Sequence, residues 1–335
     1  MRDFCSTMVT EDIRGGYPGM SETSLLPIRE NRRYGYINRK GSVVIPPQYE
    51  YAGSFAEGLA NVRLSGKHGF IDTTGRIAIP PKFEEVHFGF KEGVAIVEDD
   101  FYQYCIDTTG KEVLGAGLEQ VKPFVDGLAA ACVDRLWGFM DKSGSFVIPP
   151  AFEDVRGFSC GLSAAKRNGR WGFVDKSGRF AIEPQYALID SFSGDGLACV
   201  SQDGRTVEYI NVRGETVIGG GYAIANPFWK SRFSEGLAAV FIDGKCGAID
   251  TKGLLVIPPI YEEIGLFSEG LAAVKINQLW GYVDRTGHVR IPAVYRYAAP
   301  FSGGLAKVTI EYMQGGSDHK EAYIDSRGEY VWTNG

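Results

Sequence analysis

Nine Asp or Asn residues recur along the chain, each three positions before a glycine. They are Asn38, Asp72, Asp107, Asp141, Asp175, Asn211, Asp250, Asp284 and Asp325. A row of carboxylates is the donor set that a hard cation would need. The fixed distance to glycine favours another role, because an Asp that accepts a backbone N–H, followed by a glycine with positive φ, forms a tight turn. We therefore predict turns at these positions rather than a cation site.

A second group with chemical potential lies in the stretch where the recurring pattern is weakest. His87, Glu92, Asp99, Tyr102 and Tyr104 combine an imidazole, carboxylates and phenols, the side chains that carry general acid–base catalysis. No nucleophile elbow, phosphate loop or dinucleotide fingerprint accompanies them. An enzyme whose pocket is built from these residues is therefore one alternative for the function.

Histidine and cysteine, the ligands of structural zinc sites, are too scattered to form one. The chain has four histidines and six cysteines, with no Cys-x-x-Cys pair and no cluster of metal spacing. We predict free thiols, no metal and no cofactor. Acidic pairs such as Glu84-Glu85 and Glu262-Glu263 follow an aromatic residue in several copies, and we expect them on a solvated return segment.

Two insertions interrupt the pattern, and insertions in repeat proteins often carry binding residues. One spans residues 226–233 and contains Trp229, Lys230 and Arg232; exposed Trp and Arg are enriched in binding hot spots. The other spans residues 311–320 and contains Tyr312 and His319. These five residues are the predicted partner-binding set. A loop that only packs on itself is the alternative in each place.

The elements that position these residues follow from the period of the pattern. Successive Asp/Asn positions are 34, 35, 34, 34, 36, 39, 34 and 41 residues apart, so the base period is 34. A Phe-x-x-Gly element, as in residues 55–58 and 267–270, lies between successive turns. Aligning Leu271 with Leu25 extends the register to the first copy and gives nine modules, ending near Trp332. We predict an N-terminal extension, residues 1–23, expected to be flexible, and one repeat array, residues 24–335.

Each module is expected to be an all-β meander. A strand such as residues 271–276 leads through a tight hairpin turn to a second strand, such as residues 171–175. The Asp-x-x-Gly turn leads to a third strand, which stops at a Pro pair such as Pro149-Pro150 or places it at the sheet edge. An irregular fourth strand carries the chain back. A glycine inside the second strand implies that a neighbouring backbone or aromatic ring packs closely over it.

The modules can be arranged in two ways, as an open array or as a closed ring. One module cannot bury its recurring aromatic residues alone, so stacked neighbours must complete each core. We favour an open, solenoid-like superhelix, because it accepts any number of modules and nine exceeds the usual four to eight propeller blades. The alternative is a closed toroid or β-propeller, which a short distance between residues 25 and 332 would reveal.

The recurring residues resemble a known family. Trp171-Gly-Phe-Val-Asp, Val147-Ile-Pro-Pro and Phe267-Ser-Glu-Gly-Leu-Ala-Ala-Val closely resemble bacterial WG repeats, also called KWG repeats, over nearly all of the chain beyond residue 23. The resemblance implies binding or interaction modules and supplies no catalytic residue. Three modules depart from the pattern and should pack differently, because their Trp-Gly pair is replaced by Gln103-Tyr104, Val207-Glu208 and Glu321-Ala322.

Composition narrows the classes of function. Hydrophobic residues make up 44% of the 335 residues and the net charge is -6, so the chain can bury a core. No apolar stretch approaches the ~20 residues of a membrane span, and the acidic balance argues against a nucleic-acid partner. The polar N-terminus lacks a signal-peptide core, which predicts a cytoplasmic protein. The leading hypothesis is a non-catalytic scaffold that binds a protein or polymeric ligand; glycan or cell-wall binding is a further alternative.

Overall fold

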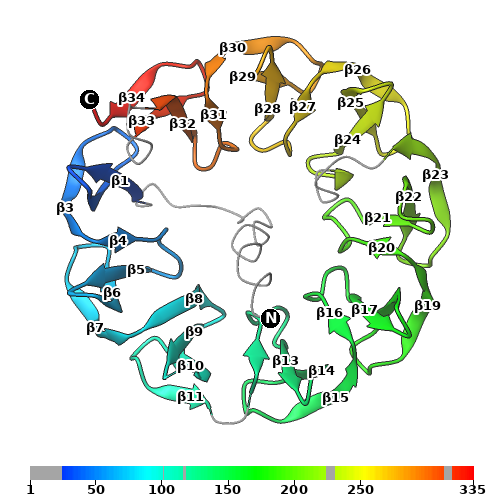
Figure 1. The fold of residues 1–335 in the computed structure, drawn as a ribbon, viewed down its shortest axis with the longest axis horizontal. Helices are drawn as coiled ribbons and strands as arrows, with labels where there is room; N and C mark the ends of the chain where they lie inside the picture. The colour runs from blue at the N-terminus through cyan, green and yellow to red at the C-terminus, as the bar shows by residue number, and fades with distance from the viewer. Residues whose placement is uncertain (1–24, 101, 116–117, 224–230, 313–318) are drawn as a thin grey trace, which may run out of the picture.

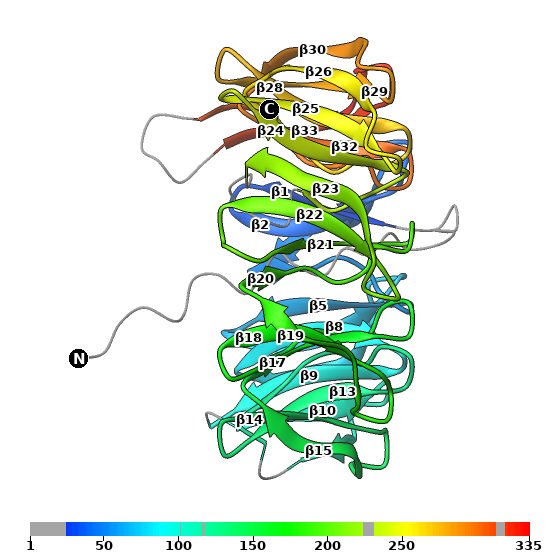
Figure 2. The same ribbon diagram turned by 90° about the vertical axis from the view of Figure 1, so that its right-hand side faces the viewer.

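The protein forms a ring of β-sheets. The computed structural model describes residues 25–335 except 101, 116–117, 224–230 and 313–318, and these residues form antiparallel strands with almost no other regular structure. The strands group into nine modules around a central axis (Figure 1). Seen from the side, most strands cross the thickness of the ring (Figure 2). The predicted all-β tandem meander is confirmed.

Each module contains up to four strands in sheet order, here named inner, second, third and outer. The outer strands lie along the rim (Figure 1). Inner strands in the described residues are β4 (Tyr51–Ala52), β8 (Glu85–Lys91), β12 (Gln120–Val121), β16 (Asp154–Val155), β20 (Leu188–Ile189), β27 (Glu263–Ile264) and β31 (Tyr297–Ala298). Second strands are β1 (Leu26–Glu30), β5 (Leu59–Leu64), β9 (Val94–Asp99), β13 (Ala129–Val133), β17 (Ser163–Arg167), β21 (Leu197–Ser201), β24 (Leu237–Ile242), β28 (Leu271–Ile276) and β32 (Leu305–Tyr312).

The other two strands of each module follow across a hairpin and an Asp-x-x-Gly turn. Third strands are β2 (Arg33–Ile37), β6 (Lys67–Asp72), β10 (Tyr102–Asp107), β14 (Leu136–Met140), β18 (Arg170–Val174), β22 (Thr206–Asn211), β25 (Lys245–Asp250), β29 (Leu279–Asp284) and β33 (His319–Asp325). Outer strands are β3 (Val43–Tyr49), β7 (Ile77–Phe83), β11 (Glu112–Leu114), β15 (Phe146–Phe152), β19 (Phe180–Tyr186), β23 (Thr216–Ala223), β26 (Leu255–Tyr261), β30 (Val289–Tyr295) and β34 (Tyr330–Thr333).

The sheet boundary is offset from the repeat boundary. The predicted fourth strand exists, but it pairs with the next module: β3 ends at Tyr49, and β4 begins at Tyr51 as the inner strand of module 2. Between modules 6 and 7, β23 pairs directly with β24 at Ala223 and Phe241, which joins two modules in a seven-stranded sheet. A complete four-stranded sheet therefore contains residues of two successive repeats.

The glycine of the Trp-Gly pair is required by the backbone of the outer strand. A Cβ at Gly172 would lie 2.4 Å from the Ile182 oxygen and 2.8 Å from the Pro184 nitrogen. The outer strand bulges here, because Trp171 faces Tyr186 while Phe173 faces Ile182. Of the two alternatives for the Pro pair, the edge position is confirmed and the strand end is wrong: β15 continues through Pro149-Pro150 at the sheet edge, where a missing N–H is tolerated.

The modules that lack this glycine also lack the Pro pair opposite it. In module 6, Glu208 occupies the glycine position, and the facing strand carries Gly219-Gly220 in place of the two prolines. A Cβ at Gly219 would meet no atom within 4 Å. In this module the glycines lie on the outer strand instead of the third strand. This is how module 6 differs in packing from the modules with a Trp-Gly pair, as predicted.

The core lies between modules rather than within them. The aromatic residue of one third strand packs on the Phe of the next Phe-x-x-Gly element, with ring centroids 4.8 Å apart for Tyr36 and Phe55 and for Tyr282 and Phe301. Asp-x-x-Gly glycines rest on an aliphatic residue of the preceding module, as Gly287 does on Ile257. Burial therefore depends on neighbours, as expected for a repeat protein.

The ring is closed, so the favoured open superhelix is wrong and the toroid alternative holds (Figure 1). The Tyr323 hydroxyl of module 9 donates to the Pro27 oxygen of module 1 over 2.9 Å. Ile28 shares a buried cluster with Tyr323 and Trp332. In an open array, the first and the last module would each leave one apolar face exposed to water. Closure of the ring buries these two faces against each other. Within the described residues, no strand is shared across this seam.

Candidate functional site

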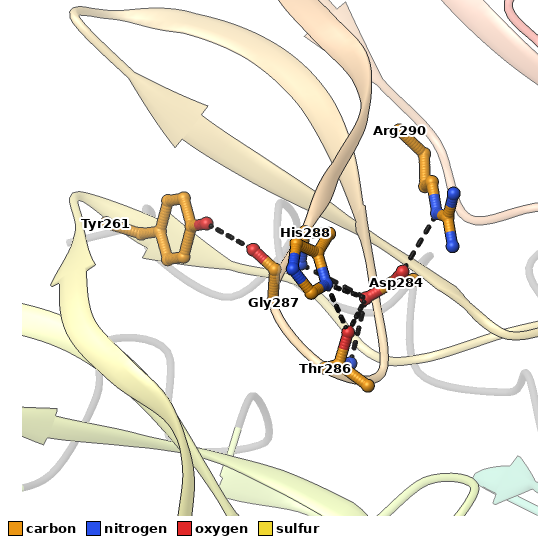
Figure 3. Close-up of polar contacts among 6 residues, drawn as sticks. All are labelled: Tyr261, Asp284, Thr286, Gly287, His288 and Arg290. Atoms are coloured by element: carbon orange, nitrogen blue, oxygen red, sulfur yellow. Dashed lines mark hydrogen bonds and ion pairs between the residues drawn. The ribbon is translucent and has the colours of Figure 1, made fainter.

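The recurring carboxylates form turns, as predicted. In module 8 (Figure 3), Asp284 Oδ1 accepts the Thr286 hydroxyl at 2.6 Å, the Thr286 N–H at 2.9 Å and the His288 N–H at 3.1 Å. Arg290 donates to Asp284 Oδ2 over 2.8 Å. The hydroxyl bond of Thr286, followed by the backbone bonds, holds the pKa of Asp284 well below its usual range.

This turn contains Asp, Thr and His but lacks the order that nucleophilic catalysis requires. The Thr286 hydroxyl lies between the carboxylate and the imidazole, 2.7 Å from His288 Nδ1, whereas a triad places the imidazole between carboxylate and hydroxyl. The Tyr261 hydroxyl of module 7 donates to the Gly287 oxygen and fixes the turn to its neighbour (Figure 3). In the described part of the chain, no three His, Cys, Asp or Glu residues are arranged to hold a metal ion.

The Phe-x-x-Gly element joins neighbouring modules in a polar clasp. The Ser268 hydroxyl donates to the Phe301 oxygen over 2.7 Å, and the Glu269 carboxylate accepts the Gly304 N–H over 2.8 Å. Glu235 makes the same bond to the N–H of Gly270. The Ser-Glu-Gly sequences at residues 234–236 and 268–270 thus connect module 7 to module 8 and module 8 to module 9, a role that the sequence did not reveal.

The first member of each acidic pair caps a hairpin turn. Glu262 accepts the Gln278 N–H over 3.2 Å, and Glu153 accepts the Gly169 N–H over 3.1 Å. Glu50, which follows the aromatic residue of β3, accepts the Gly66 N–H over 3.0 Å in the same way. These carboxylates accept backbone N–H groups and have a structural role. The expected solvated return segment is therefore an inner strand, and its first acidic residue caps a hairpin turn.

The predicted acid–base residues divide into separate pairs. His87 Nε2 lies 2.7 Å from Glu98 Oε2, and the Tyr104 hydroxyl donates to Asp99 Oδ2 over 2.7 Å. Burial, followed by the bond to Asp99, raises the pKa of Tyr104. Tyr102 is exposed.

Glu92 is in the turn between β8 and β9, so it is separated from these pairs. It accepts the Gly127 N–H and pairs with Lys142 at 3.4 Å, as part of the clasp. The structure therefore brings His87, Asp99 and Tyr104 into one sheet, and Glu92 has a structural role at a different turn.

Arg232 has a structural partner. Its guanidinium donates two bonds of 2.8 Å to Asp190, whose side chain is 3% exposed. This places Arg232 in an ion pair between modules 6 and 7 instead of at the expected exposed hot spot. Trp229 and Lys230 lie outside the described residues.

The second insertion lies beside the seam of the ring. Tyr312 pairs with His319 at the end of the β32–β33 hairpin, and nothing is described of the Tyr312 side chain. His319 lines a cleft of about 430 Å³ between modules 9 and 1. The other lining residues are Arg29, Glu30, Asn31, Arg32, Glu321 and Asn334. Of the predicted binding residues, His319 is the one that the described structure places in a cleft.

An exposed apolar surface on the rim was missed by the sequence reasoning. Leu254 and Ile260 are each 62% exposed, and Leu255, Val289 and Val294 are about half exposed on the same two outer strands, β26 and β30, or beside them. We name these five residues the rim patch. The position of Leu254 holds a polar or charged residue in the other eight modules, namely Ser42, Arg76, Lys111, Ser145, Arg179, Glu215, His288 and Glu329. Comparison of this column between modules is the signal that could have found the patch.

In the part of the chain that is described, no helix is long and apolar enough to span a membrane. No functionally curated protein matches this chain significantly.

Comparison with solved structures finds matches at low sequence identity. A eukaryotic initiation factor is 13% identical with a TM-score of 0.66, and the match covers 92% of this chain and 95% of that one. The computationally designed Ika8 protein is 13% identical, with a TM-score of 0.46 over 80% and 96% of the two chains. BamB from Moraxella catarrhalis is 12% identical, with a TM-score of 0.40 over 92% and 95%. The first of these likenesses supports the fold alone.

The sequence itself matches the WG containing repeat, which agrees with the packing described above. The matched segments are residues 34–67, 69–100, 105–137, 137–171, 171–205, 247–280 and 280–312. They cover more than half of the chain and run from one Trp-Gly position to the next. The chain therefore belongs to the WG-repeat family.

Proposed function

We propose that this protein is a non-catalytic scaffold that binds another protein through the rim patch. The observation that carries the proposal is the replacement of a polar column by Leu254, which directly precedes exposed Leu255, with exposed Ile260 near the other end of the same strand. Contiguous exposed apolar side chains on a folded protein mark interaction surfaces, because leaving them in water is unfavourable. A partner with an apolar surface of its own would bury them.

The consensus polar residues support a scaffold role, because their side chains bind other parts of the same ring. The turn carboxylates bind their own turns, the clasp residues bind neighbouring modules and the acidic pairs cap hairpins, as the bonds of Asp284, Glu269 and Glu262 illustrate. Recognition must therefore use residues that differ between modules. The rim patch is such a difference, since the position of Ile260 holds Gln48, Lys82 and Gln185 in three other modules.

The rim favours contact through side chains over strand addition. Pro258 and Pro259 lie in the middle of β26 and provide no N–H to a partner strand. The partner surface is therefore expected to be a folded apolar face rather than an extended peptide at this place. Trp229, Lys230, Tyr312 and His319 remain predicted contacts of the same scaffold.

A cytoplasmic location belongs to the same proposal. The described cysteines, Cys105, Cys132, Cys160, Cys199 and Cys246, are all free thiols, which suits a reducing compartment. The net charge of -6 supports a protein partner over a nucleic acid.

The test compares proteins captured by the wild-type chain with those captured by Leu254→Glu and Ile260→Glu. Both side chains are mostly exposed, so the fold should tolerate the charge. Ile77→Glu is the matched control, because Ile77 is 52% exposed at the position in β7 that corresponds to Leu255. We expect a protein that is retained by the wild type and by Ile77→Glu and lost with both patch variants. Identical capture by all four chains would refute the role of the patch.

A further inference from the structure

The hairpin of module 5 places two arginines opposite each other. Arg167 is the last residue of β17 and Arg170 is the first of β18, and the two are paired across the turn formed by Asn168 and Gly169. Both turn residues have positive φ, 51° and 74°, as a two-residue hairpin turn requires. Cross-strand partners have their side chains on the same face of a sheet, so two positive charges lie side by side.

The corresponding hairpins of other modules avoid this pairing of cations. The same two positions hold Glu30 and Arg33, Leu64 and Lys67, Asp99 and Tyr102, Val133 and Leu136, Ile242 and Lys245, and Ile276 and Leu279. Like charges directly opposite each other destabilise a strand pair. Module 5 therefore has an unfavourable arrangement that the repeat itself does not need.

Both guanidinium groups are held in place by contacts that use little of their hydrogen-bonding capacity. The guanidinium carbon of Arg167 lies 4.8 Å from the ring centroid of Phe180 and 5.3 Å from that of Phe152. Arg170 Nη1 donates to the Gln202 oxygen of module 6 over 3.0 Å. Within the described residues, neither arginine forms an ion pair with a carboxylate. A guanidinium has five N–H donors, so most donors of this exposed pair are left to the solvent.

The two arginines line a cleft of about 220 Å³ between their hairpin and the outer strand β19. Phe180 and Pro184 give the cleft an apolar side, and Asn168 and Glu183 complete the lining. Two cations and one carboxylate give this lining a net charge of +1. The cleft is smaller than the ~300–1,000 Å³ of sites for drug-sized molecules. Its size therefore fits a single side chain.

The charge and shape of the cleft define the chemistry of its ligand. A carboxylate is planar and accepts two parallel hydrogen bonds from a guanidinium. Its single negative charge offsets the net charge of the lining and relieves the repulsion between the two arginines. The methylene groups of a glutamate would contact the apolar side of the cleft. A phosphate dianion exceeds the net charge of the lining and would lie close to the carboxylate of Glu183.

We propose that this cleft binds a glutamate or aspartate side chain of a partner protein, with its carboxylate held between Arg167 and Arg170. The identity of the carrier as a protein rests on the proposed scaffold function, whereas binding of a carboxylate by the cleft does not. The cleft belongs to module 5, so it is separate from the rim patch on β26 and β30.

The test follows the Nε–H signals of the arginines by NMR while the full chain is titrated with N-acetyl-glutamate N-methylamide at low salt. We expect the signals of Arg167 and Arg170 to shift saturably. The matched glutamine probe should bind at least about tenfold more weakly, because hydrogen bonds to a charged group are stronger than those to a neutral one. Equal binding of both probes would overturn the proposal. A phosphoserine probe that binds tenfold more tightly than the glutamate probe would also overturn it, in favour of a phosphate site.

Two protein variants locate the binding in the cleft. Arg167→Gln introduces the residue that module 6 has at this position, Gln202, and Arg170→Leu introduces that of module 4, Leu136, so both variants should fold. Each should weaken binding of the glutamate probe by about tenfold, read from the signal of the remaining arginine. Arg179→Gln is the matched control, because it removes an exposed arginine from the Asp-x-x-Gly turn of the same module. Circular dichroism checks the fold, and unchanged affinity in both cleft variants would refute the site.

Glu183→Gln tests the charge argument by itself. Removing this carboxylate from the lining should tighten binding of the glutamate probe by about two- to threefold at low salt, and the gain should shrink as salt is added. Weaker binding by Glu183→Gln would contradict the argument. Leu254→Glu should bind the probe normally, so a failure of the rim patch and a failure of this cleft give different results.

Discussion

Replacing Gly172 by Ala tests the explanation of the Trp-Gly pair. The new Cβ would lie 2.4 Å from the Ile182 oxygen and 2.8 Å from the Glu183 carbonyl carbon and the Pro184 nitrogen. These are backbone atoms of a bulged strand, so relief requires the outer strand to move by several tenths of an ångström. Overpacking of this kind costs about 1–3 kcal/mol. The lower entropy of an unfolded chain with Ala offsets about 0.4–1 kcal/mol of it.

The expected net loss is about 1–2 kcal/mol of unfolding free energy, which lowers the melting temperature by about 2–4 °C in a chain of this size class. Gly89→Ala in β8 is the matched control, because a Cβ there meets no atom within 4 Å and its φ is not in the left-handed region. Its melting temperature should stay the same or rise. Thermal and urea unfolding of both variants supply the measurement. Equal stability of Gly172→Ala and Gly89→Ala would refute the close-approach explanation.

Further outcomes follow from the ion pair, the clasp and the turns. Arg232→Ala should destabilise the ring by about 3 kcal/mol in urea unfolding because it leaves the Asp190 carboxylate buried without this partner; combining Asp190→Asn with Arg232→Met in one chain should recover part of the loss, and an unchanged midpoint for Arg232→Ala would contradict the buried-pair reasoning. Glu269→Ala should lower stability by about 1 kcal/mol through the lost bonds to the next module, whereas Glu269→Gln should lose less, with both midpoints read in the same titration. The hydrogen bonds of the turns lower the pKa of Asp175 in the folded state, the Ser177 hydroxyl first, so its stabilisation is present above pH ~4 and is lost as the pH falls further. Asp175→Asn should therefore reduce the acid sensitivity of the melting temperature between about pH 4 and 2, and an identical slope would argue against the turn as its source.

The period of the sequence specified the modules but not the way they join. Asp-x-x-Gly turns, short hairpins and nine meanders depend on contacts within about ten residues of each other, and these are visible in a single repeat. Closure depends on contacts such as that between Tyr323 and Pro27, which the repeat pattern does not contain. The count of nine modules, above the usual four to eight propeller blades, favoured an open array, whereas burial of the two terminal faces decides for a ring.

The candidate sites illustrate the same limit. Arg232 had the residue type of a hot spot, yet its partner Asp190 lies in the preceding module, 42 positions earlier. Glu92 had the residue type of a catalytic acid, yet its carboxylate binds the next turn. Leu254 was not among the predicted binding residues, because a single leucine matches no functional motif. Its exposure becomes evident only when the outer strands place this position of the repeat on the surface.

Closure across the seam has a consequence for synthesis of the protein on the ribosome. The hydroxyl bond between Tyr323 and Pro27 joins residues 296 positions apart, so the face of module 1 that contains Ile28 stays uncovered by module 9 until the last module is made. An uncovered apolar face on a nascent chain is a feature that chaperones bind and that leads to aggregation. The apolar face of module 1 is thus the surface that stays exposed for longest during translation. A ribosome stalled before module 9 would hold a chain on which this face is still in water.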